Sequence, residues 1–168
     1  MKRLMKRLLR DTRGNALVGL AFILPIVLGL SFGILEFSVL IFDFHRANEA
    51  TRRIARQAAM VEPLVDQATL TINGSATCTG TACKGLAALT AVAKSAFPKI
   101  APENVAITYS LTEIGDLNTP GGVKPLITVR ITGLQHDFLL INGLKGMPKS
   151  LTFPPLTTST LGRWFEPS

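Results

Sequence analysis

The sequence has little of what enzymes and metal-binding proteins need. Its 168 residues include 2 cysteines and 2 histidines, His45 and His136. A metal site needs more ligands of these types close together, so none is expected. There is no paired-carboxylate motif, no glycine-rich phosphate loop after a strand, and no serine or cysteine with an identifiable base. The sequence therefore predicts a protein with no enzymatic activity, no cofactor and no small-molecule substrate. His45 is expected on a solvated helix surface beside a membrane, and His136 in a loop between strands.

Acidic residues are scarce at the N-terminus, where most of the excess positive charge lies. The net charge is +7, and residues 1–14 hold six lysines or arginines against Asp11 alone. The rest of the chain is close to balanced, so it shows no electrostatic footprint for nucleic acid. The charge belongs instead to a basic segment beside a membrane.

Charge is absent from the 22 residues 14–35. A bilayer core is crossed by roughly 20 apolar residues in helical form, so this stretch is long enough to span. A cleaved secretory signal is the alternative, but its apolar region is normally about 7 to 15 residues long, and FDFHRANEA offers no convincing cleavage site. Six basic residues precede the span and four follow it soon after, which favours a cytoplasmic N-terminus.

The two cysteines, Cys78 and Cys83, are spaced C-T-G-T-A-C in a stretch rich in threonine, glycine and alanine. Such a stretch can turn tightly enough for a local disulfide, which would form in an oxidising compartment such as the bacterial periplasm. Two free thiols, a metal site and a redox pair are the alternatives. A redox pair would more often be C-x-x-C.

The helical pattern continues beyond the span. A thin apolar stripe at steps of three and four follows in a segment with neither glycine nor proline, and Pro63 marks its boundary. We expect a continuous helix from about residue 15 to about residue 62. The stripe consists of Ala47, Ala50, Ile54, Ala58 and Val61. The expected organisation is a basic leader (1–14), a transmembrane helix (15–42), a helical stalk (43–62) and an extracytoplasmic head (63–168).

The head is predicted to be a small α+β domain. Residues 86–97 place Leu86, Leu89, Val92, Ala93 and Phe97 on one helical face. Residues 105–112 and 126–132 alternate apolar and polar, as strands with one buried face do, and the turn-rich connection favours antiparallel pairing. A further strand is expected in 151–161, at an edge or with a bulge because of its two prolines. The predicted fold is a three- or four-stranded sheet with helix on one face.

The order of features over about residues 13–60 resembles the TadE-like proteins of tight-adherence (type IVc) pilus systems. The matching features are Arg13-Gly14 as a leader end, the small run 15–18, Leu24-Pro25, Glu36-Phe37 and the later RRIARQAA. The resemblance implies a pilin-like subunit, either a minor pilin or a pseudopilin. It also implies an inner-membrane location with the head in the periplasm or at the surface. The implied partners are the membrane, other pilus subunits, the assembly machinery and a prepilin peptidase that would cut between Gly14 and Asn15.

The sequence departs from this pattern at Gly19. Pilin-like proteins carry a glutamate five residues after the cleaved bond, where it can pair with the new α-amino group of a neighbouring subunit. Gly19 cannot do so. Two interpretations follow: the leader is still removed after Gly14, or it is kept and the protein stays a single-pass assembly factor.

Glu36 is the one charge late in the apolar stretch. Its carboxylate either lies at the headgroup level or faces a partner helix inside the membrane. Gly29 and Gly33 form a G-x-x-x-G step just before it, which would allow close approach of another helix. The alternative function is an anchored extracytoplasmic binding module unrelated to pili.

Overall fold

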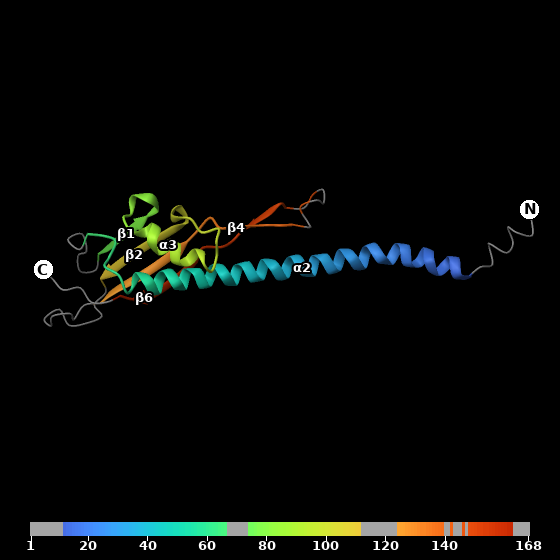
Figure 1. Cartoon of the computed structure of the whole chain (residues 1–168), viewed down its shortest axis with the longest axis horizontal. Coiled ribbons are helices and arrows are strands. Elements are labelled where there is room, and N and C mark those ends of the chain that lie inside the picture. The colour runs from blue at the N-terminus through green and yellow to red at the C-terminus, as the bar shows by residue number, and fades with distance from the viewer. Residues whose placement is uncertain are drawn as a thin grey trace, which may run out of the picture. The chain divides into compact units, whose positions relative to one another are not determined.

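A computed structural model describes residues 12–66, 74–111, 124–139, 142, 146 and 148–162. It divides into two compact units. One contains residues 1–39 and 138–149, and the other contains residues 40–137 and 150–168. A single helix, α2 (Thr12–Ala58), contributes to both (Figure 1). The predicted combination of a long N-terminal helix with a small antiparallel sheet is confirmed.

The helix ends four residues before the expected end. After Ala58 the chain turns, and Val61, expected on the apolar stripe, is exposed. The other four stripe residues are buried, because this half of α2 supplies one side of the head core. The predicted domain limits stay predictions. The segment expected as a stalk is nevertheless packed within the head unit, because its stripe is covered by the sheet side of that unit.

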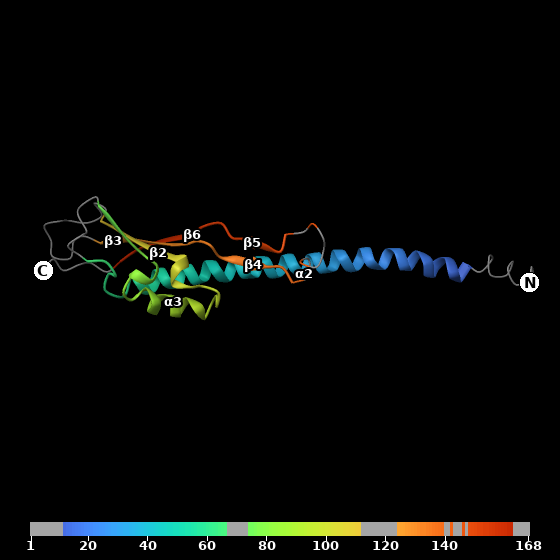
Figure 2. The ribbon, with the colours of Figure 1, turned by 90° about the horizontal axis from the view of Figure 1, so that it is seen from above.

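The head sheet has four strands in the order β1-β2-β3-β6, all antiparallel. Figure 2 shows the head portion of α2 and the helix α3 on the same side of this sheet. The strands are β1 (Ser75–Thr79), β2 (Val105–Leu111), β3 (Pro125–Ile131) and β6 (Leu156–Leu161). The predicted pairing of the two alternating segments is confirmed as β2 with β3.

The two faces of the sheet differ as the alternation predicts. Val105, Ile107 and Tyr109 of β2 are buried against the helices. On the other face threonine and serine hydroxyls meet across neighbouring strands, with Thr77 and Thr108 Oγ1 atoms 3.0 Å apart. Such cross-strand pairs are worth about 0.2 to 1 kcal/mol each.

Three strands, β1 (Ser75–Thr79), β4 (Gln135–Asp137) and β5 (Ser150–Thr152), differ from the sequence expectations. β1 was expected only as a turn-forming stretch. The expected 151–161 strand is divided into β5 (Ser150–Thr152) and the edge strand β6, because Pro154 and Pro155 interrupt the ladder between them. β5 pairs with β4 (Gln135–Asp137), which was expected as loop. Two 3-10 turns, η2 (Gly80–Ala82) and η3 (Pro102–Asn104), complete the described elements.

Helix α3 (Leu86–Lys94) is shorter than the expected 86–97 segment. It begins after Gly85, whose φ of 91° lies in the left-handed region that favours glycine. The predicted face is buried except at Val92. The chain after α3 is tied to α2, since Arg46 Nε donates to the Ala96 carbonyl at 2.6 Å.

Candidate functional site

The first half of α2 presents an apolar surface on every side. Residues 16–32 are all exposed, and large aliphatic and aromatic side chains make up most of them. The helix is long and apolar enough to cross a membrane, and its most apolar 18-residue window is 0% buried. In water such a surface would be costly, at about 25 cal/mol per Å² of apolar area, whereas lipid removes that cost. This half of α2 is therefore a candidate membrane anchor.

The predicted cleavage site lies in the first turns of α2. Thr12 begins the helix, so the bond between Gly14 and Asn15 follows its first residues. Pro25 lies further along the same helix without ending it. Proline removes one backbone donor, a defect that membrane helices tolerate.

The three glycines singled out in the sequence leave open space around the helix. A methyl group added at Gly19, Gly29 or Gly33 would meet nothing within 4 Å. Another chain could therefore approach the helix closely at each glycine. No contact within the described residues explains why glycine occupies these positions. The proposed interface at Gly29 and Gly33 stays a prediction.

Glu36 has an environment that neither sequence interpretation included. Its side chain is buried, with 4% of its surface exposed, and its Oε1 accepts a hydrogen bond from the Leu139 amide. The two residues are 103 positions apart and belong to the same compact unit. A hydrogen bond from a backbone amide offsets part of the cost of removing a carboxylate from water. No local pattern in the sequence could reveal so distant a partner.

The expectation that His136 lies in a loop is wrong. His136 lies in β4 with 3% of its surface exposed, and its Nδ1 is 2.8 Å from Asp43 Oδ2. It is buried because β4 packs on the same face of α2 that carries the apolar stripe. Asp43 was missed, although it lies four residues before Ala47 and so continues that stripe. His45 is exposed, as expected.

Cys78 and Cys83 are brought together at the end of β1 and the following η2 turn. The structure pairs them as a disulfide with their Cα atoms 5.5 Å apart. That separation is within the ordinary range for disulfides. Both cysteines border the head core.

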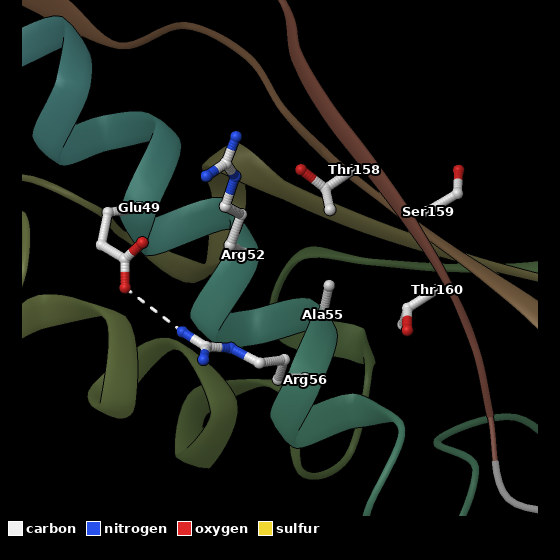
Figure 3. Close-up of a pocket in the computed structure, with 7 residues that line it drawn as sticks. All are labelled: Glu49, Arg52, Ala55, Arg56, Thr158, Ser159 and Thr160. Atoms are coloured by element: carbon white, nitrogen blue, oxygen red, sulfur yellow. Dashed lines mark hydrogen bonds and ion pairs between the residues drawn. The ribbon is translucent and has the colours of Figure 1, made fainter.

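A polar groove lies between α2 and the edge strand β6. Its volume is about 400 Å³, and Figure 3 shows Arg52 on the side of Thr158 of β6, whereas Arg56 points towards Glu49. It is lined by Glu49, Arg52, Ala55, Arg56, Thr158, Ser159 and Thr160. A guanidinium group beside hydroxyls suits a polar or acidic segment of another protein.

Glu49 is the one carboxylate in this groove. Its hydrogen bond from Arg53 Nε, at 3.0 Å, holds its pKa below the ordinary value, and Arg56 lies 3.2 Å away. It is thus engaged in ion pairs and is not a poised acid. Within the part of the chain that the structure describes, no cluster of three histidine, cysteine or carboxylate side chains could hold a metal.

Comparison with known families identifies the anchor segment. Residues 14–56 match the family of TadE-like proteins. The TadE-like segment covers α2 almost to its end and includes Gly14, Gly29, Gly33 and Glu36. The sheet lies outside it. No curated protein and no solved structure matches the chain significantly. The match bears out the resemblance of this segment to TadE-like proteins that the sequence indicated.

Proposed function

We propose that this protein is a non-enzymatic, membrane-anchored pilin-like subunit required to assemble a tight-adherence (type IVc) pilus. It acts by binding: α2 contacts the membrane and helical partners, and the head contacts other subunits. The protein lies in the bacterial inner membrane with its head outside the cytoplasm. The oxidising surroundings of the head would maintain the Cys78–Cys83 disulfide.

The overlap of the family match with the exposed apolar part of α2 is the main support for this proposal. The TadE-like match at residues 14–56 contains residues 16–32 of α2, all of which are exposed and most of which are apolar. A helix with this composition needs lipid or other apolar helices around it. A pilus subunit meets both environments, first in the membrane and then among its neighbours.

Loss of the gene tests the function directly. A strain without this protein is expected to lack surface pili and to adhere poorly, and expression of the intact chain is expected to restore both. Pili are counted by electron microscopy of whole cells. Normal piliation in the deletion strain would contradict the proposal and favour an anchored binding module unrelated to pili.

We further infer that a prepilin peptidase cuts between Gly14 and Asn15. Gly19 stands where a polymerising pilin has glutamate, which makes a minor or assembly role more fitting than that of the main filament subunit. N-terminal sequencing of the protein recovered from membranes tests the cut. A start at Asn15 is expected, and a start at Met1 would contradict it.

The helix face at Gly29 and Gly33 is proposed to contact a partner helix. The paired change Gly29→Leu with Gly33→Leu is expected to weaken co-purification with other pilus subunits. Since added side chains there meet nothing within 4 Å in this chain, the head should keep its stability. Ile34→Leu, on the same exposed stretch, is the matched control and should leave co-purification unchanged. Equal recovery of partners with both variants would contradict the interface.

A further inference from the structure

The segment 138–149 directly follows β4, about a hundred residues after the membrane half of α2 in the chain. It shares a compact unit with residues 1–39. Its described link to the helix is the hydrogen bond from the Leu139 amide to Glu36 Oε1. A second backbone bond, from the Phe138 amide to the Lys149 carbonyl at 3.0 Å, closes the base of the segment.

Glu36 fixes the level of this segment along the helix. It lies near the head-side end of the predicted span 15–42, and the next charged residue after it is Asp43. The residues beside it on α2, Ile34, Leu35 and Phe37, are apolar and exposed. A group bonded to Glu36 is therefore held near the head-side end of the span, close to the headgroups.

Leu139 is exposed at that level. Its side chain has 80% of its surface accessible, the largest exposed fraction among the exposed large apolar residues of the described chain. The amide of the same residue is held by Glu36, so the backbone at Leu139 stays beside the helix at this level. The sequence from 138 to 149, FLLINGLKGMPK, has two charges, and both are lysines. Apolar residues with nearby lysines suit an interface with anionic lipid headgroups.

We propose that Leu139 makes a second contact of this chain with the membrane, in the interfacial region on the head side, and that Glu36 holds it there. The partner is the lipid surface itself. The contact sets the depth and rotation of α2, since two points of one unit then touch the bilayer. It depends on α2 spanning the membrane and is independent of the pilus role.

Fluorescence quenching by brominated lipid tests the contact. The full chain is reconstituted into phosphatidylcholine–phosphatidylglycerol vesicles whose acyl chains carry bromine, in a Trp164→Phe background that removes the single tryptophan. Single reporters are then placed by Leu139→Trp, by Leu28→Trp within the span, and by Thr157→Trp on the exposed face of β6. We expect quenching at positions 28 and 139 and none at 157.

The three reporters separate the possible outcomes. Quenching at 28 without quenching at 139 would overturn the contact and leave the anchoring intact. No quenching at 28 would overturn the anchoring of α2 and the contact with it. Quenching at all three positions would show that the head lies on lipid generally, and would overturn a specific role for Leu139.

A pair of Glu36 variants tests the tether. Glu36→Gln keeps an oxygen that can accept from the Leu139 amide, whereas Glu36→Leu has none. The Leu139→Trp reporter is expected to keep its quenching with glutamine and to lose most of it with leucine. Quenching of the Leu28→Trp reporter should be the same in both, which shows that α2 still inserts. Equal quenching at 139 in both variants would overturn the role of Glu36.

Discussion

The two halves of α2 differ in how far their apolar side chains are exposed. In the first half, Ile34 has 68% of its surface exposed, as do most of its neighbours to a similar extent. In the second half, Ile54 is 0% exposed and lies in the head core. One unbroken helix thus meets two environments, and only the second is supplied by its own chain among the described residues.

The difference shows in the choice of residues. The buried stripe of the second half is made of small residues with one isoleucine between them, namely Ala47, Ala50, Thr51, Ile54, Ala55 and Ala58. Small side chains let a helix lie close to its neighbours. The first half carries large aliphatic residues on all sides, which is the composition of a helix surrounded by lipid or other helices. The periodicity of the pattern, more than its hydrophobicity, distinguishes the two environments.

The largest difference in stability is expected between two variants that each truncate one isoleucine of α2, one in each half. Ile54→Ala should lower the free energy of unfolding of the head by about 2 to 4 kcal/mol, because it leaves a cavity in a packed core. Ile34→Ala makes the same chemical change at an exposed site and should alter head stability little. Urea denaturation of the full chain in detergent micelles, followed by circular dichroism, measures both. Similar losses of unfolding free energy in the two variants would contradict the difference in burial between the halves.

The Cys78–Cys83 disulfide is expected to contribute to the stability of the head. Closing a loop as short as Cys78 to Cys83 removes chain entropy worth about 2 kcal/mol from the unfolded state. Cys78→Ser with Cys83→Ser should therefore reduce head stability by about that amount. Dithiothreitol should lower the urea midpoint of the native chain towards that of the double variant and leave the variant unchanged. A native chain insensitive to the reductant would argue for two free thiols.

The buried phenol of Tyr109 should make the stability of the head depend on pH. Its hydroxyl accepts a hydrogen bond from the Leu64 amide at 3.3 Å, so Tyr109→Phe should cost about 0.5 to 1.5 kcal/mol at neutral pH. Burial raises the pKa of the phenol above its ordinary value of 10.0. The unfolded chain then loses this proton first, so stability should fall as pH rises above about 10. The Tyr109→Phe variant should show a flatter profile, and identical profiles would contradict the burial effect.

The smallest effect is expected on the exposed side of α2 at Glu49. Its ion pairs with Arg53 and Arg56 are accessible to solvent and are screened by salt. Glu49→Gln should lower the urea midpoint slightly at pH 7. Because the pKa of Glu49 is lowered in the folded chain, this small contribution is present above the ordinary pKa of 4.5 and lost as pH falls below it. A large loss at pH 7 would mean that the pairs matter more than their exposure allows.

Local patterns predicted the elements whose burial repeats with a regular period. The alternation in 105–112 and 126–132 identified β2 and β3, and the stripe from Ala47 to Ala58 identified the buried face of α2. β1 and β4 were missed because they are short and their partners set their burial.

The site was less predictable because its contacts join residues that are far apart in the sequence. Glu36 bonds to Leu139 and His136 to Asp43, across 103 and 93 positions, and no spacing rule reaches that far. The glycines at 29 and 33 were visible in the sequence as a G-x-x-x-G motif, and among the described residues nothing lies within 4 Å of a methyl group added at either. What the sequence could not supply is which distant backbone amide or strand would satisfy a buried polar side chain.

Spin-label accessibility along α2 tests the two environments most directly. In a Cys78→Ser, Cys83→Ser background, nitroxides are attached at Leu28→Cys and Arg52→Cys, two exposed positions in different halves of the helix. After reconstitution into vesicles, the label at 28 should be reached by oxygen more than by a water-soluble nickel chelate, and the label at 52 should show the reverse. Equal access of the chelate to both positions would contradict a membrane-anchored subunit.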